Sequence, residues 1–486
     1  MDIDIRQLFL LLIAIAVPMI LIWRRQSRLL GAWVCFTFFV QIFDTVILTN
    51  LPAGRIVGLL FLPNAVRTIH QWARLRPIQA WLFNYGWLVL LGLMFGFLWP
   101  WPDTTLARPF SLQAPGRTLI YLTRTLADLS LAVFLAKELA RTPSLLWMGR
   151  WLVAGATLSS LAGVLQFFFN VDLYYTLTGL GEQVVFMGRS RGLVGEPRAL
   201  GLACAYGSMT LLLGRRNITP YWTVLLLINL TGLLLTYSAS SLVLFLAGIL
   251  VVLLFFSNQE RLIALAVLGF MLTVILISSI LLPEQFAFAV DTLRYRFDPE
   301  VKLSGIPPGT WAQEIAYRLD VFDASALLFL IDQPLYALLG TGPGLVTLPA
   351  SEHIPPGQYS SIWTAEVGIN SPPYHGLLLE IANSGMLGLA LWIWQVRLCL
   401  LSLRRLSAFP SLTDRRREEW VFGYALFLLG ATFYLIQVSY SPVWSLFLAI
   451  GWAAVNLLEK LEASSVAPEW DLSQASSALD QERGLR

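Results

Sequence analysis

Runs of about twenty apolar residues recur along almost the whole of this 486-residue chain. A helix needs about 20 residues to cross a hydrocarbon core of about 30 Å, so each run is long enough to span a bilayer. Only 13% of the residues are charged, whereas a soluble domain carries about 25% because it must cover a surface that faces water. The sequence therefore predicts an all-α polytopic membrane protein.

Thirteen of these runs are candidate spans, which predicts about 12–13 transmembrane helices. About ten lie within residues 1–283 and about three within 376–460, so residues 284–375 form one large loop. Residues 461–486 are rich in Ser, Ala and acidic side chains, and we expect this tail to be disordered. The candidate spans are approximately residues 5–23, 29–48, 54–70, 80–99, 117–139, 145–170, 193–214, 221–237, 239–256, 262–283, 376–400, 420–440 and 442–460.

The first apolar run and the three cysteines both fit a chain that is embedded in a membrane. The N-terminus lacks the basic region and the cleavage site of a signal peptide, so the first run is predicted to be a retained helix. Cys35, Cys204 and Cys399 each lie inside an apolar run, where a cysteine behaves as a small buried hydrophobic residue. No disulfide framework is expected.

Lys and Arg in short connections predict the orientation, because cytoplasmic loops retain positive charge. When the thirteen spans alternate, 21 basic residues fall on one side and six on the other. This asymmetry predicts a multi-pass protein of the inner (plasma) membrane, with its C-terminus in the cytoplasm. The N-terminus and the loop 284–375 are then periplasmic. The six basic residues on that side are Arg6, Arg55, Arg108, Arg117, Arg189 and Arg191.

The first polar feature on the predicted outer face is Gly188-Arg-Ser-Arg-Gly-Leu-Val-Gly-Glu-Pro-Arg, which opens the seventh span. A guanidinium group offers a fork of donors that matches phosphate oxygens and keeps its charge at every physiological pH. Arg189 and Arg191 are therefore candidate phosphate ligands, and Pro197 suits a first helical turn. The simpler alternative is a pair of arginines that extend toward lipid headgroups at a helix end.

The second feature is the loop 284–375, which is far longer than ordinary connections. Its residues Trp311–Asp332 have the apolar period of an amphipathic helix that could lie along the membrane interface and place Arg318 near phosphates. Gly340-Thr-Gly-Pro-Gly then predicts a turn, which is more plausible than a phosphate-binding loop. The apolar face of the predicted helix consists of Ile315, Leu319, Phe322, Ala326 and Phe329.

The third feature is His375, one of three histidines, at the point where the chain re-enters the membrane. A neutral imidazole there can take a proton from a sugar hydroxyl, which makes His375 a candidate general base. A helix cap or a headgroup contact is the ordinary alternative. Within the spans, Arg124 and Asp128 stand four residues apart and are expected to pair, and Asp44 lies near the outer face.

Other classes of function find little support in these residues. The net charge of +3 gives no indication of nucleic acid as a partner. Neither a nucleotide-binding motif nor a metal-ligand cluster occurs, so no cofactor is expected. A reaction on the outer face must therefore draw its energy from the substrate, for example from a lipid-linked sugar diphosphate. The absence of an internal repeat argues against many transporter folds.

Taken in order, these stretches resemble the O-antigen ligase and O-antigen polymerase superfamily over about Arg189 to Leu400. The family pattern Arg-x-x-Gly-x-Phe-x-Asn-Pro is similar to Arg189-Ser-Arg-Gly-Leu-Val-Gly-Glu-Pro, with Val194 for the aromatic residue and Glu196 for the Asn. A Ser-rich outer hairpin is resembled by Thr236-Tyr-Ser-Ala-Ser-Ser. Arg318, the following helix and Pro334-Leu-Tyr-Ala-Leu-Leu-Gly-Thr-Gly-Pro-Gly resemble the third motif.

The last motif is a His followed by Leu and Gly-x-x-Gly, which His375 and Asn383-Ser-Gly-Met-Leu-Gly-Leu resemble. Nine residues separate His375 from Gly385 where the family usually has ten, so Tyr374 takes the usual register. Either a local shift of one residue returns His375 to the site, or this chain lacks the base in its usual position.

The resemblance implies a metal-independent membrane glycosyltransferase that inverts the anomeric centre of a polyprenyl-diphosphate-linked glycan. Arg189, Arg191 and Arg318 would hold the diphosphate, and Arg318 would also stabilise the charge that develops in the reaction. His375 would act as the base, with Glu196 and Tyr374 in support. The long loop would cover the site and exclude water.

Several partners and acceptors remain open. The acceptor is either another lipid-linked glycan, as in a polymerase, or a lipid A core, as in a ligase, and the variant at Glu196-Pro197 favours the polymerase. Membrane lipids and chain-length regulators or flippases are expected partners. An anion transporter, for example of bicarbonate, is an alternative of another class, and a structural component of an envelope complex is a third.

Overall fold

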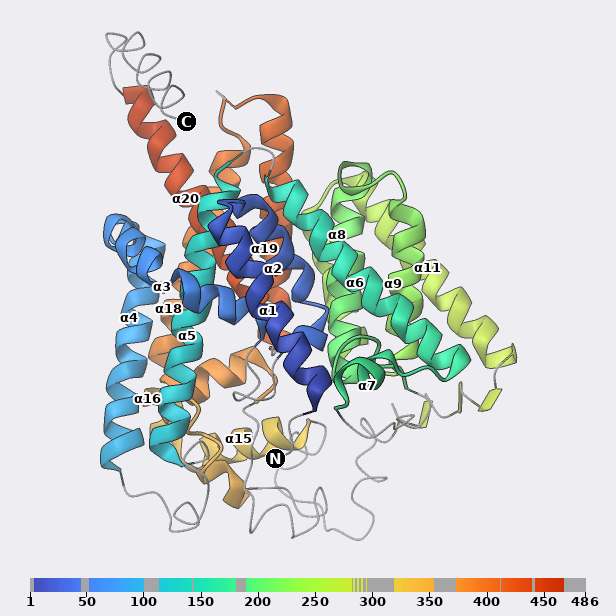
Figure 1. Cartoon of the computed structure of the whole chain (residues 1–486), viewed down its shortest axis with the longest axis horizontal. Helices are drawn as coiled ribbons and strands as arrows, with labels where there is room; N and C mark the ends of the chain where they lie inside the picture. The colour runs from blue at the N-terminus through green and yellow to red at the C-terminus, as the bar shows by residue number, and fades with distance from the viewer. Residues whose placement is uncertain are drawn as a thin grey trace.

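The computed structural model describes residues 4–44, 52–99, 113–141, 144–180, 189–281, 319–353, 373–410, 412–438 and 442–466, with scattered positions between 283 and 294. Within these residues the protein is a bundle of helices (Figure 1). Eight of them are long and apolar enough to cross a membrane, and two shorter apolar helices accompany them. The chain is thus an all-α, multi-pass membrane protein, as its sequence predicts.

Each of the thirteen predicted spans contains a helix of the structure. The second is the shortest, because α2 ends at Thr37 and a 3₁₀ turn follows at Gln41–Phe43. The number of actual crossings stays a prediction. The helices are α1 (Ile5–Trp23), α2 (Ser27–Thr37), α3 (Ala53–Trp72), α4 (Arg76–Leu91, continued by the π-helical η2 at Gly92–Leu98), α5 (Ala114–Leu139), α6 (Ser144–Phe169), α8 (Pro197–Ile218), α9 (Trp222–Leu235), α10 (Ala239–Phe255), α11 (Asn258–Leu281), α18 (Gly376–Ser407), α19 (Asp414–Ile436) and α20 (Trp444–Val466).

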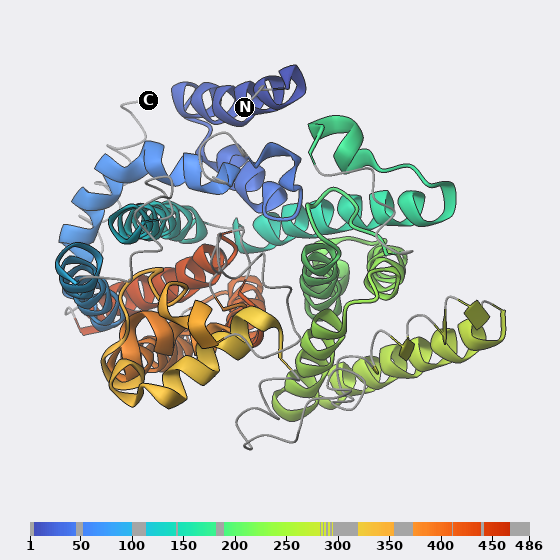
Figure 2. The ribbon, with the colours of Figure 1, turned by 90° about the horizontal axis from the view of Figure 1, so that it is seen from below.

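The helices differ strongly in how much of them is covered by protein. In the apolar 18-residue stretches of α19 and α20, 61% and 67% of the residues are buried inside the protein. In those of α1 and α11 the buried shares are 11% and 17%. Viewed from below, α19 and α20 lie inside the bundle, and α1 and α11 lie at its periphery (Figure 2). Since lipid replaces protein around a peripheral span, the exposed apolar side chains of α1 and α11 are those expected of a membrane-facing helix.

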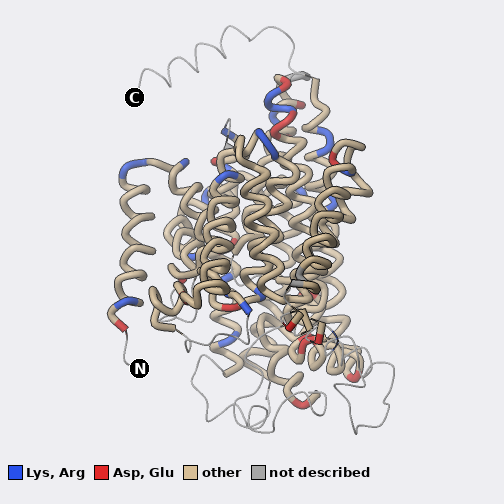
Figure 3. Tube along the Cα trace, turned by 90° about the vertical axis from the view of Figure 1, so that its right-hand side faces the viewer, with Lys and Arg blue, Asp and Glu red and all other residues tan. Residues whose placement is uncertain are grey.

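Short helices outside the predicted spans lie across one end of the bundle, away from the C-terminal end of α20 (Figure 1). They are α7 (Leu173–Thr178), α15 (Val321–Asp332), α16 (Pro334–Leu339) and the 3₁₀ helix η5 (Pro349–His353). Lys and Arg gather at the opposite end, beside the end of α20, while Asp and Glu are frequent near the short helices (Figure 3).

The predicted amphipathic helix needs a correction. The helix begins at Val321, because Leu319 and Asp320 are not helical and the Asp320 side chain accepts the N–H of Phe322 as an N-cap. Residues 311–318 lie outside the described residues. Burial also follows more than one face, since Ala324 and Ser325 are buried as well as Ala326 and Phe329. Thus α15 packs against protein on several sides.

The glycine-rich turn that follows α16 packs against a kink in α18. At Gly385 the backbone of α18 leaves helical geometry with a φ of 70°, which frees carbonyl groups that would otherwise bond within the helix. The N–H of Thr341 donates to the carbonyl of Ala382 at 2.8 Å, and the N–H of Gly342 donates to that of Asn383 at 3.0 Å. The turn is therefore structural and ties the loop to α18.

Candidate active site

The start of α18 is held against α15 by the buried carboxylate of Asp323, whose side chain is 1% exposed. One carboxylate oxygen, Oδ1, accepts the backbone N–H groups of Tyr374 at 2.8 Å and His375 at 3.0 Å. The other, Oδ2, lies 2.9 Å from Nδ1 of His375, which is within ion-pair distance although the two atoms do not have hydrogen-bond geometry. The first amide groups of a helix lack partners within the helix and favour negative charge, so Asp323 meets a need that α18 itself creates.

This contact determines what His375 can do. A carboxylate this close to Nδ1 favours a proton on that nitrogen, which leaves Nε2 with a lone pair. Among the described residues, Nε2 has no hydrogen-bond partner, and the side chain is 41% exposed. The arrangement is that of a general base whose orientation and tautomer are set by a second residue.

A positive charge faces this pair from α8. The Arg198 guanidinium forms an ion pair with Asp320 at 2.8 Å and lies over the ring of Tyr374, 4.0 Å from its centroid. Asp320 is also the N-cap of α15. One arginine thus connects α8, the start of α15 and the residue before His375.

These groups surround a pocket of about 230 Å³, which we call the catalytic pocket. Its walls come from α8, α10, α15, the segment before α18 and the end of α19. All four stretches of the superfamily resemblance lie at or beside it. The lining residues are Arg198, Ala239, Ser240, Val243, Leu319, Asp320, Asp323, Tyr374, His375, Ile436 and Gln437.

The serine hairpin between α9 and α10 borders the same pocket. The Ser241 hydroxyl donates to Ser238 Oγ at 2.9 Å and approaches the carbonyl of Arg198 at 3.4 Å. A side chain at Gly201 would collide with Ser241, so the glycine permits α8 and α10 to pack closely. The serines of this hairpin therefore also fix the start of α8, from which Arg198 projects.

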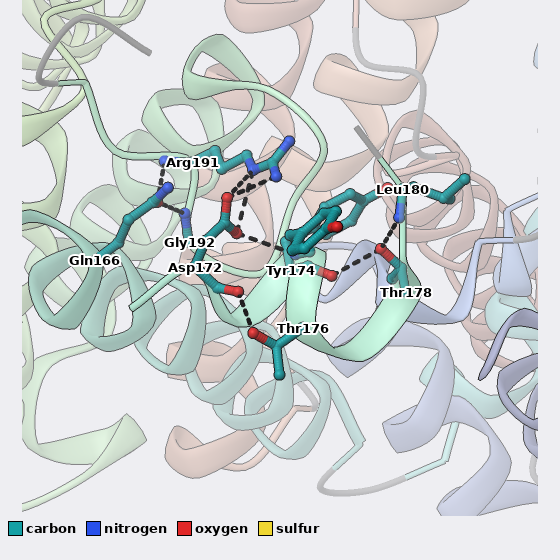
Figure 4. Close-up of polar contacts among 9 residues, drawn as sticks. Gln166, Asp172, Tyr174, Thr176, Thr178, Leu180, Arg191 and Gly192 are labelled. Atoms are coloured by element: carbon teal, nitrogen blue, oxygen red, sulfur yellow. Dashed lines mark hydrogen bonds and ion pairs between the residues drawn. The ribbon is translucent and has the colours of Figure 1, made fainter. Parts of the chain in front are cut away.

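Arg191 has a different position from the one expected of a diphosphate ligand (Figure 4). It is 2% exposed and forms an ion pair with Asp172, with a closest distance of 2.6 Å. Its guanidinium lies 5.1 Å from the ring centroid of Tyr174, whose pKa burial raises to about 12. Its backbone N–H donates to Gln166 Oε1 at 2.8 Å. Arg191 does not line the catalytic pocket.

The other predicted site residues divide into three groups. His375 and Tyr374 line the catalytic pocket. Arg189 is half-buried and donates to the carbonyl of Thr236 at 2.9 Å, while Glu196 is an exposed N-cap of α8 that makes no side-chain capping bond. Arg318 lies outside the described residues, although its neighbour Leu319 lines the pocket.

Two site residues, Asp323 and Arg198, were not expected from the sequence. Both belong to stretches already singled out, but a contact between α15 and α18, or between α8 and α15, leaves no periodic signal. A usable clue existed for Asp320, since an Asp before an apolar run is typical of an N-cap. That N-cap is also the partner of Arg198.

A comparison with protein families adds independent evidence. The family model described as O-antigen ligase matches residues 224–393. The match includes the serine hairpin, α15, the glycine turn and His375. No curated protein sequence matches the chain. Residues 224–393 are therefore similar to the O-antigen ligase family, and the resemblance of this chain to the O-antigen ligase and O-antigen polymerase superfamily is confirmed.

Proposed function

We propose that this chain is a glycosyltransferase that moves a polyprenyl-diphosphate-linked glycan onto a sugar hydroxyl at the periplasmic face of the inner membrane. The observation that carries the proposal is the Asp323–His375 pair, with Nδ1 and Oδ2 2.9 Å apart, in a pocket formed by the family motifs. The family match supports a glycosyltransferase-type activity.

His375 acts as the base in this proposal. Its Nε2 takes the proton of the acceptor hydroxyl as that oxygen bonds to the anomeric carbon of the donor. The bond from this carbon to the diphosphate breaks on the opposite face, and the diphosphate leaves with the electron pair, so the configuration inverts. Asp323 stabilises the imidazolium that forms. Base catalysis of this kind contributes about 10²–10⁴ in rate.

Arginines neutralise the leaving diphosphate in this proposal. Arg198 faces the catalytic pocket, and Arg318 precedes Leu319, which also lines it. Guanidinium groups in a site that excludes water stabilise developing negative charge strongly, so we propose a metal-independent reaction. Arg189, beside the serine hairpin, extends this positive region. We assign Arg191 to the support of the loop before α8, since Asp172 neutralises it.

The orientation in the membrane supports a periplasmic site. The end of the bundle with α15 and His375 lies away from the end where Lys and Arg gather (Figure 3). Positive charge is retained in the cytoplasm, so we place α15 and the catalytic pocket outside.

The acceptor is the point on which two activities differ. A polymerase adds the glycan to another lipid-linked glycan, and the variant at Glu196-Pro197 favours this choice. The description of the matching family favours a ligase, which adds it to a lipid A core. We propose polymerisation of surface polysaccharide or O-antigen units, with the ligase as the second candidate.

The test uses two histidine variants on the same side of the protein. His375→Ala is expected to abolish assembly of surface glycan, seen on gels of whole-cell extracts. The matched control is His353→Ala, because His353 also contacts a carboxylate of α15, Asp332, at 3.3 Å, but does not line the catalytic pocket. The control is expected to leave the glycan unchanged.

Arg198→Ala provides an independent test, with the same expected loss of glycan. Unchanged glycan in both His375→Ala and Arg198→Ala would overturn the proposal. Anion uptake into liposomes that neither substitution affects would then favour a transporter. Accumulated single repeat units identify a polymerase, and long chains that remain on the carrier lipid identify a ligase.

A further inference from the structure

A second cavity of about 230 Å³ lies inside the bundle next to the catalytic pocket. Its walls come from α3, α4, α5, α8, α18, α19 and α20, and Tyr374 and Gln437 line both cavities. It extends from Tyr374 to residues of α18 beyond the kink at Gly385, such as Gln395. This inner cavity is many times larger than the space of about 30 Å³ that one water molecule takes up.

Acidic and basic residues line the inner cavity in equal number. Asp128 forms a two-point ion pair with Arg55, with distances of 2.8 and 3.0 Å. The sequence predicted Arg124 as the partner of Asp128, and the ion pair with Arg55 joins α5 to α3. Glu380 accepts the hydroxyl of Tyr434 at 2.5 Å. Two carboxylates and two arginines therefore line the cavity, and such a balance suits an uncharged ligand better than a diphosphate.

Four buried polar atoms that belong to residues lining the cavity have no hydrogen-bond partner among the described residues. Two are acceptors, Asn84 Oδ1 and Gln437 Oε1, and two are donors, Trp392 Nε1 and Gln395 Nε2. Leaving such groups unpaired is costly, so native proteins satisfy nearly all of them with protein, water or ligand. A ligand rich in hydroxyl groups meets both kinds of need, because each hydroxyl donates and accepts.

Aromatic rings provide the rest of the wall. Trp392, Tyr434 and Trp444 form one cluster of rings, in which the two tryptophan centroids lie 5.6 and 4.8 Å from that of Tyr434 and 5.7 Å from each other. Trp81 and Tyr85 stack at 5.2 Å on α4. Mostly aromatic walls with a few placed polar groups are typical of small-ligand sites. A pyranose ring fits this pattern, since it combines an apolar face of C–H groups with a rim of hydroxyls.

We infer that the inner cavity is the subsite for a neutral sugar of the acceptor glycan. The charged diphosphate of the donor belongs on the other side, with Arg198, and the shared residues Tyr374 and Gln437 place the acceptor sugar beside His375. This inference rests on the proposed function, since it assigns a substrate to the same reaction.

The test compares transfer by Gln395→Leu and Trp392→Phe with transfer by the wild type in nanodiscs. Lipid-linked repeat units from cells that lack this chain serve as donor, and the same oligosaccharide, freed from its lipid by mild acid, serves as acceptor. Both variants are expected to raise the KM for the oligosaccharide about 3- to 10-fold, the worth of one hydrogen bond. The KM for the donor is expected to stay unchanged.

Trp33→Phe is the matched control, because Trp33 Nε1 is also buried without a hydrogen-bond partner among the described residues but does not line the inner cavity. It is expected to leave both KM values unchanged. Wild-type protein is also expected to show a higher Tm with the freed oligosaccharide, and Gln395→Leu a smaller rise, which measures binding without catalysis.

Two results separate this inference from the proposed function. Unchanged acceptor KM in both cavity variants, with His375→Ala inactive, overturns the inference and leaves the transferase intact. A wild type that shows no Tm rise and no transfer with the oligosaccharide also overturns it, as does an equal effect of Trp33→Phe. Activity retained in His375→Ala overturns the proposed function itself.

Discussion

Asp323 serves two purposes with one side chain, since one oxygen caps α18 and the other holds the imidazole of His375. An amide in its place keeps the shape but offers a single acceptor and a donor group. If the amide N–H points at Nδ1, the ring must move its proton to Nε2 and can no longer act as a base.

Asp323→Asn is therefore expected to reduce the rate of glycan transfer by about 10²–10⁴ while the protein remains folded. Transfer from the lipid-linked donor in nanodiscs measures the rate, and the Tm of the purified protein reports folding. Asp332→Asn on the same helix, with an exposed carboxylate, is the control and should keep full activity. A folded Asp323→Asn protein with the wild-type rate would contradict the role assigned here.

At the scale of elements, the ion pair between Arg191 and Asp172 connects α7 to the loop before α8. The two side chains are 3% and 6% exposed, so neither has water as an alternative partner. Asp172 also caps α7 by accepting the N–H of Tyr175 at 3.0 Å. The loop that leads to Arg198 thus depends on this pair for its position.

Removing one partner of a buried pair leaves an uncompensated charge, which costs about 3–5 kcal/mol. Asp172→Asn is accordingly expected to lower the Tm markedly. The double variant Asp172→Leu with Arg191→Met should be more stable than Asp172→Asn, because no charge is left buried. Thermal unfolding in detergent, followed by tryptophan fluorescence, checks both. Equal Tm values for Asp172→Asn and the wild type would refute this account of the pair.

The kink of α18 is a second element on which the site depends. Gly385 has a φ of 70°, and a side chain there would meet the backbone of Leu338 and Leu339 in α16 and that of Gly340. Gly385→Ala is expected to separate the glycine turn from α18 and to expose the loop to proteolysis. Limited digestion with chymotrypsin measures this, because residues 319–396 contain no Lys or Arg at which trypsin could cut. Gly86→Ala in α4 is the control, since a side chain there has open space around it.

The sequence predicts features that depend on neighbouring residues, but not contacts between residues that lie far apart in the chain. Helices follow from local hydropathy, so a helix lies in each predicted span, and His375 at the start of α18 was found in the same way. Pairs such as Asp323 with His375, Arg198 with Asp320 or Arg55 with Asp128 join separate helices, and no spacing rule connects them. At His375, where the register differs by one residue, Asp323 contacts both the side chain and the backbone of the residue.

For the whole molecule, the excess of Lys and Arg at one end predicts the orientation in the membrane. The three cysteines are buried, so a single introduced cysteine can be labelled against a low background. Glu352 and Arg415 are both exposed and lie at opposite ends of the predicted topology.

In intact spheroplasts, a membrane-impermeant maleimide is expected to label Glu352→Cys, whereas Arg415→Cys should react only after the membrane is permeabilised. The unsubstituted protein gives the background. The reverse pattern would place the catalytic pocket in the cytoplasm and contradict the proposed use of a periplasmic donor.

The junction of α15 with α18 has a consequence for exchange between relatives. The carboxylate comes from one element and the imidazole from another, and residues 354–372 stand between them in the chain. A chimera that takes the large loop from one parent and the last three helices from another separates Asp323 from His375. Each of the two residues must then pair with a residue from the other parent. Swaps that keep residues 320–385 together carry the pair, the glycine turn and the kink as one inheritable unit.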